Sequence, residues 1–248
     1  MIEKILLTRP AGFNDEIAAA LQARKVQVVQ APLIKIQGLN LVTAQLPPDG
    51  YLDPEQYIIF TSQNAIDYSG DLIPQLARTA KANVFAVGPA TKMRLEALGV
   101  LAVASDQPGS EPLLSLPVFA APFARKVLIV TGLLGRDYLE TTLQDRGATV
   151  ARYECYERVP QRIENLDELI AEGYNTILVT STDILQALSS QLTGASRRRV
   201  VLCVTASRIA DVARRMGYIR LIEAPDASVS GILKGLTLDP SNQGAEFS

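Results

Sequence analysis

The 248-residue chain contains no histidine. That absence removes the commonest general base of enzymes, the Ser–His and Cys–His nucleophile systems, and the commonest metal ligand. Any chemistry must therefore use carboxylates, Tyr, Lys, Arg, hydroxyl groups, backbone dipoles or the substrate itself.

Cysteine is also scarce. Cys155 and Cys203 form no CxxC motif, so neither a zinc site nor a disulfide framework is indicated. Two lone thiols fit a reducing cytoplasm. The N-terminal MIEKILLTRP reaches a predicted strand within four residues, which leaves no room for a signal peptide, and no apolar run approaches the length that spans a bilayer. We therefore expect a cytoplasmic protein with no membrane partner.

Charge of one sign does not dominate either. The chain has 24 Lys and Arg against 26 Asp and Glu, which gives a net charge of −2 and indicates no nucleic-acid partner. The one basic run, RRR at 197–199, is expected to lie in a solvated loop. No GxGxxG follows the first predicted strand and no GxxxxGK[ST] occurs, so a nucleotide cofactor is not indicated.

The chain does contain a regular alternation of short apolar runs and amphipathic segments. Segments such as NDEIAAALQARK and GRDYLETTLQDRG have helical periodicity. Solid apolar strands that alternate with helices predict an α/β fold, with parallel sheets covered on both faces. Strands are predicted at 4–8, 26–30, 57–61, 84–87, 100–104, 126–131, 148–153, 176–180, 200–204 and 219–223.

The sequence also repeats itself at a nearly constant offset. KILLT and LQARK resemble KVLIV and LQDRG at an offset of 122, IIFTS resembles ILVTS at 119, and two further blocks follow in the same order. Such a repeat favours two copies of a five-strand unit over one ten-stranded sheet. It leaves open whether each domain is contiguous or the two halves exchange their first βαβ units.

The ends of the predicted strands are rich in Ser, Thr, Gly and Asn and poor in carboxylates, as in TSQNA at 61–65 and TSTD at 180–183. Open parallel sheets bind ligands at these carboxyl ends. Each hydroxyl taken alone is more simply a helix cap, which contributes about 1 kcal/mol. Because the bias occurs in both copies, and helix N-termini attract anions, the pattern as a whole favours an anion site.

Two further features could carry chemistry. Gly132 and Gly135 in GLLGR would let the backbone approach a ligand, and Arg136 in the first helical turn is either a contact for a charged partner or an ordinary exposed side chain. Tyr156 lies in the segment ECYERVP and is one of the few neutral proton donors in a chain without histidine. A wedge that packs the joint between the domains is an equally good interpretation of Tyr156.

The runs ILLTRP, PLI, FTSQNA, VFAVGPAT, GLLGRDYLETTLQDRGATV, CYER and LVTSTDIL resemble the uroporphyrinogen-III synthase family in order and spacing over nearly the whole chain. One departure stands out. In the turn that follows the strand predicted at 126–131, the family often carries an Arg immediately before the glycine, and this chain has Thr131 at that place.

The resemblance implies two similar flavodoxin-like parallel-sheet domains joined by a two-stranded extended linker. Residues 1–35 and 161–248 would form one discontinuous domain and residues 37–153 the other, with connectors at 32–36 and 154–160. It further implies a monomer that needs neither a metal nor an organic cofactor, and a transient contact with the preceding enzyme of the pathway.

The activity implied by the resemblance is the closure of linear hydroxymethylbilane to uroporphyrinogen III in heme biosynthesis, with inversion of ring D and loss of water. The substrate is a polycarboxylate, which suits strand ends lined by hydroxyl groups and helix N-termini. Tyr156 is the expected catalytic proton donor. The expected substrate-binding residues are Arg9, Thr61, Ser62, Asn64, Gly88, Thr91, Gly132, Gly135, Arg136, Thr180, Ser181 and Ser207.

Two other interpretations remain at this point. A hinged ligand-binding or sensor protein without catalysis would also lack histidine and a cluster of catalytic carboxylates. A nucleotide-dependent α/β enzyme is the third, and the missing Gly-rich phosphate loop counts against it. The isomer of porphyrinogen formed from hydroxymethylbilane would separate all three.

Overall fold

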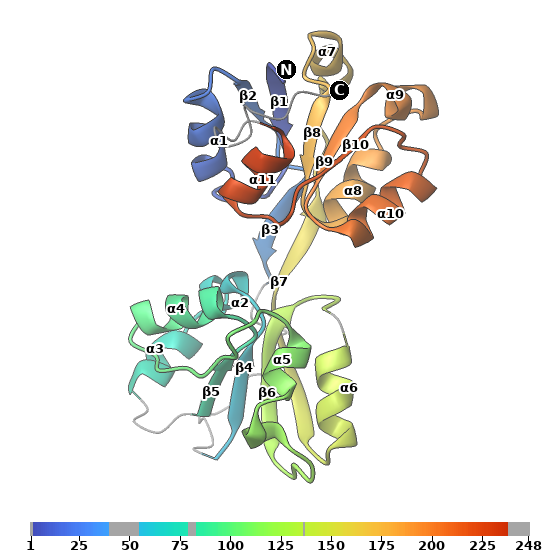
Figure 1. Cartoon of the computed structure of the whole chain (residues 1–248). Coiled ribbons are helices and arrows are strands. Elements are labelled where there is room, and N and C mark those ends of the chain that lie inside the picture. Colours follow the sequence, from blue (N-terminus) through green and yellow to red (C-terminus); the bar gives the residue numbers. More distant parts are fainter. Residues whose placement is uncertain (1, 40–54, 79–82, 136, 238–248) are drawn as a thin grey trace. The chain divides into compact units, whose positions relative to one another are not determined.

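The computed structural model describes residues 2–39, 55–78, 83–135 and 137–237 (Figure 1). The chain divides into two compact units. The first comprises Met1–Lys35 with Val159–Ser248, and the second comprises Ile36–Arg158. Two five-stranded sheets form the centres of these units.

The first sheet has the strand order β10-β9-β8-β1-β2, and all its neighbouring strands pair in parallel. Its strands are β1 (Lys4–Leu7), β2 (Gln27–Gln30), β8 (Thr176–Val179), β9 (Val201–Val204) and β10 (Leu221–Glu223). The helices of this unit are α1 (Asp15–Gln22), α7 (Leu166–Ala171), α8 (Thr182–Ser189), α9 (Gly194–Arg199), α10 (Ser207–Arg215) and α11 (Val229–Gly235).

Alternate residues of the first sheet supply a core on each of its faces. Ile5 and Leu7 of β1 pack with Leu178 of β8 against α1 and α11. Helices α8 and α10 pack against each other on the opposite side of the sheet (Figure 1). The buried strand residues are aliphatic, as expected for parallel strands covered on both faces.

The second sheet has the order β3-β7-β6-β4-β5, and the β7-β6, β6-β4 and β4-β5 pairs are parallel. Its strands are β3 (Ile34–Gly38), β4 (Tyr57–Phe60), β5 (Asn83–Ala86), β6 (Lys126–Gly132) and β7 (Thr149–Pro160). The helices are α2 (Gln63–Asp67), α3 (Leu72–Arg78), α4 (Pro89–Ala97), α5 (Ser110–Leu114), the 3₁₀ turn η2 (Pro117–Phe119) and α6 (Tyr138–Asp145).

The second sheet is also covered on both faces. Ile58 and Phe60 of β4 pack with α2, α3 and α4, whereas Ile59 between them packs with α5 and α6. Strand β4 therefore buries successive side chains on opposite faces, which explains why its sequence is a continuous apolar run rather than an alternating one. Helices α2, α3 and α4 lie together beside β4 and β5 in Figure 1.

The two sheets have the same order when strands equivalent in the sequence repeat are compared. The first reads β2-β1-β8-β9-β10, and the second reads β7-β6-β4-β5 followed by a parallel bridge between Phe85 and Val103. The strand predicted at 100–104 is thus reduced to this one bridge, and the prediction of a full strand there is wrong. Val103 makes both backbone hydrogen bonds to β5, but Leu101 is exposed and supplies no core contact that would extend the pairing.

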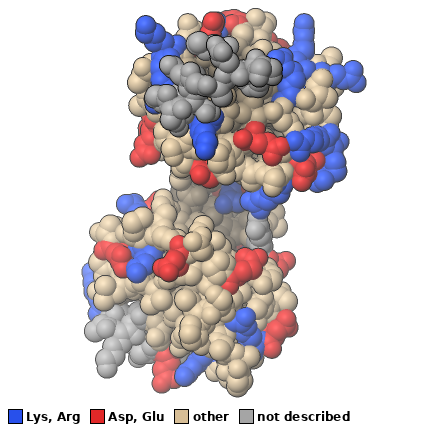
Figure 2. Space-filling model, viewed as in Figure 1, with Lys and Arg blue, Asp and Glu red and all other residues tan. Residues whose placement is uncertain are grey.

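The prediction of a solvated loop at 197–199 is wrong, because all three residues are helical and Arg197 is half-buried. These arginines end helix α9, and the half-buried Arg197 donates hydrogen bonds to the carbonyl oxygens of Ser189 (2.6 Å) and Met216 (3.2 Å). Those carbonyls close helices α8 and α10, where a cation also complements the helix dipole. Elsewhere on the face shown in Figure 2, basic and acidic side chains are interspersed on each unit.

Both cysteines are buried, and burial raises the pKa of the Cys155 and Cys203 thiols to about 12. Each thiol stays protonated in the folded chain at a pH where the unfolded chain already releases its proton. The free energy of unfolding is therefore expected to fall as the pH rises from the ordinary thiol pKa of 9.0 towards about 12. Urea unfolding at about pH 8 and about pH 10.5 measures this loss, and a Cys203→Ala variant should lose less over the same interval. A stability that rises with pH in this range would contradict the assignment.

Candidate functional site

The residues predicted to bind substrate lie at the carboxyl ends of parallel strands in both units. In the first unit Arg9 follows β1, Thr180 and Ser181 follow β8, and Ser207 follows β9. In the second unit Thr61, Ser62 and Asn64 follow β4, Gly88 and Thr91 follow β5, Gly132 and Gly135 end or follow β6, and Tyr156 lies in β7. Arg136 lies outside the described residues.

Two of the predicted serines cap helices, and one does not. The Ser62 hydroxyl accepts a hydrogen bond from the backbone N–H of Ala65 (3.1 Å), and Ser181 accepts one from Ile184 (3.2 Å). Ser207 was expected to cap α10, but the N-cap is Ala206 and Ser207 is the first helical residue. The expectation is wrong because Ala206 holds the extended conformation that a capping residue adopts.

Helices α4 and α10 consequently begin without a side-chain cap. Their N-cap residues are Gly88 and Ala206, neither of which carries a hydrogen-bonding side chain. The first backbone N–H groups of a helix need partners, and an anion can supply them. These two helices occupy equivalent places in the repeat, so each unit has an uncapped helix start at this place. Helices α1, α5, α6 and α7 also begin without a side-chain cap.

Two further side chains of the predicted site residues make hydrogen bonds within the protein. The Thr61 hydroxyl donates to the Val130 carbonyl (3.1 Å), which ties the end of β4 to β6. Arg9 donates to the carbonyl oxygens of Ala227 (2.6 Å) and Phe13 (3.4 Å), and burial lowers the pKa of its guanidinium. Both side chains therefore shape the loops around the strand ends.

A β-bulge decides where Tyr156 points. In the pairing of β7 with β6, Thr131 lies opposite Glu154 but Gly132 lies opposite Tyr156, so Cys155 is the extra residue. Without the bulge, the period of two would place Tyr156 on the opposite face of the sheet from Tyr153. With it, both tyrosines and Cys155 join the cluster beneath α2, α3 and α4.

The Tyr156 hydroxyl lies 3.1 Å from the Ser62 hydroxyl oxygen. Ser62 already accepts the Ala65 N–H, and the two hydroxyls share one hydrogen in their mutual bond. The second hydroxyl hydrogen can therefore be donated to a further acceptor. The Tyr68 ring centroid lies 6.1 Å from that of Tyr156, and the Arg158 guanidinium carbon lies 6.0 Å from the Tyr156 centroid.

Gly132 makes room for the Tyr156 ring. A Cβ on Gly132 would lie 2.7 Å from two ring carbons and 3.1 Å from the phenol oxygen of Tyr156. The next residue, Leu133, donates its backbone N–H to the Tyr156 carbonyl (2.7 Å). The lack of a side chain at Gly132 thus serves an internal contact, and the sequence had suggested only that it let a ligand approach the backbone.

A family model described as uroporphyrinogen-III synthase HemD matches residues 15–234. The chain belongs to the uroporphyrinogen-III synthase family. This membership favours the enzyme over the non-catalytic binding protein that the sequence had left open.

Known members of the family resemble the chain over most of its length. Uroporphyrinogen-III synthase of Salmonella typhimurium is 27% identical over 243 residues, which cover 94% of this chain and 99% of the relative. The protein of the same name from Escherichia coli is 28% identical over 246 residues, with 94% and 99% covered. A crystal structure of mutant uroporphyrinogen III synthase from Thermus thermophilus superposes with a TM-score of 0.62 at 16% identity, covering 96% and 98% of the two chains, and therefore shows the α/β fold alone.

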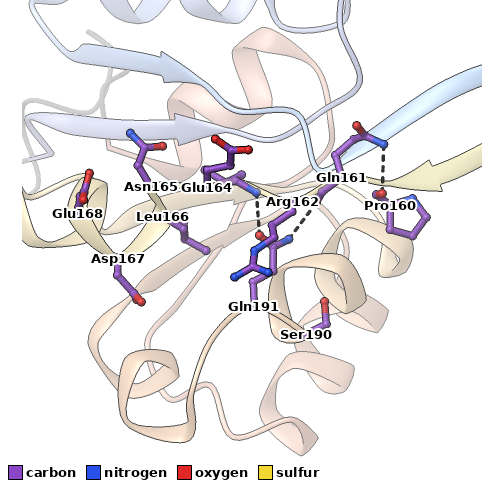
Figure 3. A pocket seen from close by; sticks show the side chains of 11 residues that line it. Pro160, Gln161, Arg162, Glu164, Asn165, Leu166, Asp167, Glu168, Ser190 and Gln191 are labelled. Carbon is purple, nitrogen blue, oxygen red and sulfur yellow. Dashed lines mark hydrogen bonds between the residues drawn. The ribbon is translucent and has the colours of Figure 1, made fainter.

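A surface hollow of about 640 Å³ in the first unit contains none of the predicted site residues. It lies between the segment that follows β7 and the end of α8 (Figure 3). Gln191 crosses it, donating to the Gln161 carbonyl (2.9 Å) and accepting from the Ile163 N–H (2.8 Å). Both ends of this amide are used within the protein, so Gln191 joins the two segments that line the hollow.

The described part of the chain has neither a metal-binding cluster nor a membrane-spanning helix. Within residues 2–39, 55–78, 83–135 and 137–237, no group of three or more Cys, Asp and Glu side chains could hold a metal ion. No described helix is both long and apolar enough to cross a membrane.

Sequence reasoning found Ser62 but missed the other surroundings of Tyr156. Tyr68, Arg158 and the bulge at Cys155 surround or orient it, yet none belongs to the predicted set. The spacing CYER could have drawn attention to Arg158, which is two residues from Tyr156. The Tyr68 contact crosses from α2 to β7 and leaves no local trace in the sequence.

Proposed function

We propose that this chain is a uroporphyrinogen-III synthase that closes linear hydroxymethylbilane to uroporphyrinogen III, with inversion of ring D and loss of water. The observation that carries the proposal is the family match over residues 15–234. The preference for small residues at the strand ends agrees with a substrate that is folded and held rather than attacked by a protein nucleophile.

The proposed architecture is two flavodoxin-like domains, 1–35 with 161–248 and 37–153, with connectors at 32–36 and 154–160. The equal strand order of the two sheets supports it, because 2-1-3-4-5 is the flavodoxin-like order. The pairing of the connectors is supported by the position of β3 beside β7 and by the Leu39 N–H bond to the Cys155 carbonyl (3.0 Å).

Tyr156 is the proposed catalytic acid. When the carbon–oxygen bond of the ring A hydroxymethyl group breaks, the pyrrole nitrogen supplies the electron pair and the phenol supplies a proton, so that the hydroxyl leaves as water. Ring D then attacks through its substituted carbon, and a spiro intermediate forms, fragments and recloses. The proton lost when the new pyrrole regains aromaticity returns to Tyr156. Ser62 supports the phenol through the 3.1 Å hydrogen bond.

The substrate carboxylates are proposed to be bound at the carboxyl ends of the parallel strands. The backbone N–H groups at the uncapped starts of α4 and α10 are proposed to donate hydrogen bonds to these carboxylates. Backbone N–H groups are proposed to do more of the binding than side chains, and the substrate is proposed to lie against Arg9, Thr61, Ser62, Asn64, Gly88, Thr91, Gly132, Gly135, Arg136, Thr180, Ser181 and Ser207. The reaction as proposed requires neither a metal nor an organic cofactor.

Three further attributes belong to the same proposal. A cytoplasmic location is supported by the two free, buried thiols. A monomer, and a transient contact with the enzyme that makes hydroxymethylbilane, rest on the resemblance to the family alone.

The deciding experiment supplies hydroxymethylbilane to the purified chain and identifies the porphyrinogen isomer by chromatography after oxidation. We expect the type III isomer in large excess. Accumulation of the type I isomer at the rate of a protein-free blank would overturn the proposal and leave the non-catalytic binding protein.

Ser62→Ala and Ser181→Ala form a matched pair that separates capping from catalysis. Each removes one helix cap and should lower the free energy of unfolding by about 1 kcal/mol. Ser181→Ala should lower turnover only slightly. Ser62→Ala also removes the partner of Tyr156, so kcat should fall further, by roughly five- to tenfold. Equal effects of the two variants, or complete loss with Ser62→Ala, would contradict this division of roles.

A further inference from the structure

Arg152 in strand β7 holds three carboxylates. Its Nε donates to Glu154 (3.1 Å), and its Nη1 donates to Glu140 (3.2 Å) and to Asp137 (3.4 Å). Only 20% of the Arg152 side chain is exposed, against 84% for Asp137. The partly buried arginine is therefore the centre of this cluster, and the three carboxylates surround it.

The cluster lies against the turn that follows β6. Glu154 pairs opposite Thr131, and Nη2 of Arg152 is 3.2 Å from the position that a Cβ on Gly135 would take. Asp137 and Glu140 begin helix α6, directly after the same turn. The turn also contacts Tyr156 through Gly132 and Leu133, on the other face of the sheet.

The net charge of this cluster would act on a polycarboxylate bound nearby. One arginine and three carboxylates carry a formal charge of −2, and removal of the arginine would leave −3 beside the proposed anion-binding edge. Like charges in partly buried positions are screened less by salt than exposed ones. Arg152 is a guanidinium that reaches this turn from the neighbouring strand.

We propose that Arg152 is a positioning residue that sets the affinity for the polycarboxylate substrate, by neutralising Glu140 and Glu154 and by packing under the 132–135 turn. The inference rests on the proposed function. Arg152 acts through its carboxylate partners and the turn, and it takes no part in proton transfer. The KM for the substrate should therefore follow the local charge, whereas kcat should change little.

Four proteins give a ladder of local formal charge. Arg152→Gln carries −3, the wild type −2, the triple variant Arg152→Gln/Glu140→Gln/Glu154→Gln −1, and the double variant Glu140→Gln/Glu154→Gln 0. At low ionic strength we expect KM to fall in that order, with about a fivefold rise for Arg152→Gln over the wild type. In about 0.5 M salt the differences should shrink to less than about twofold. Arg152→Lys should stay near the wild type because it keeps the charge.

Arg94→Gln is the matched control. Two nitrogens of Arg94 donate to one carboxylate oxygen of Asp67 (2.9 and 3.2 Å), near the C-terminal ends of α4 and α2. Arg94→Gln therefore removes one positive charge from the same unit, as Arg152→Gln does. Its KM should equal that of the wild type at every salt concentration. If Arg152→Gln folds poorly, the double and triple variants still differ by Arg152 alone.

Two results would overturn the inference. One is a KM that does not follow the charge order. The other is a rise in KM that is independent of salt and persists in the triple variant, which would indicate a merely structural role. Failure of the proposed function is distinguishable, because then the wild type itself would form no type III isomer, and the charge ladder would be read from binding of uroporphyrin III, the fluorescent oxidised product.

Discussion

Tyr156→Phe is expected to lower kcat by roughly 100-fold while KM changes less than about twofold. The phenol would donate its proton only as the hydroxyl of ring A leaves, so its loss removes an interaction made in the transition state and not in the bound substrate. The ring itself stays in place, because Phe fills the same buried volume between Gly132 and Tyr68. Steady-state kinetics with hydroxymethylbilane at saturating concentration measures the change.

Tyr153→Phe provides the control within the same strand. Tyr153 is fully buried, and its hydroxyl donates to the Ser69 carbonyl (3.3 Å), away from Ser62. This variant should lose about 1 kcal/mol of stability and keep its kcat. If Tyr156→Phe retains full kcat, or if both variants lose it equally, Tyr156 is a packing residue, as the alternative interpretation of the sequence holds.

Gly132→Ala is expected to be the second most damaging single change, with a kcat lowered by roughly 100-fold. The new methyl group would overlap the Tyr156 ring at 2.7 Å, and the ring is only 3% exposed and cannot move aside freely. The shift would break the contact with Ser62, and the overpacking should also cost about 1–3 kcal/mol of stability. Kinetics and thermal unfolding of the same preparation separate the two effects.

Gly194→Ala controls for the substitution itself. A Cβ on Gly194, in helix α9, would meet no atom within 4 Å, so stability should stay equal or rise slightly. The double variant Gly132→Ala/Tyr156→Phe tests whether Gly132 acts through Tyr156. If Gly132→Ala acts by displacing the phenol, then its effect on kcat in a Tyr156→Phe background should be much smaller than in the wild type. Multiplicative effects would indicate that Gly132 acts on the substrate directly.

Several features of the fold follow from the sequence because they depend on local patterns. The continuous apolar runs of β4 and β8 predict buried parallel strands, and the capping serines Ser62 and Ser181 mark the helix starts that follow them. Val103 shows the limit of such patterns. Its run is as apolar as the others, yet at the edge of the sheet it forms one bridge, because the exposed Leu101 supplies no core contact that would extend the pairing.

The site residues divide in the same way. Their positions at strand ends could be predicted, because parallel strands bring their carboxyl ends to one edge of a sheet. Their roles could not. Ser207 misses the cap by one residue, and Gly132 accommodates the ring of Tyr156, which comes from the next strand along the chain. Both outcomes depend on backbone and side-chain positions that only the folded chain defines.

By itself, the sequence determined the chemistry available to this protein: no imidazole, two thiols, and small hydroxyl and glycine residues at the ends of many parallel strands. Composition and periodicity are properties of the sequence and do not depend on the fold. Only the tertiary structure decided which face Tyr156 occupies and what surrounds Arg152. Those features arise from the register between β6 and β7, where one unpaired residue at Cys155 reverses the direction of the next side chain, and a register is a relation between two strands that neither strand encodes alone.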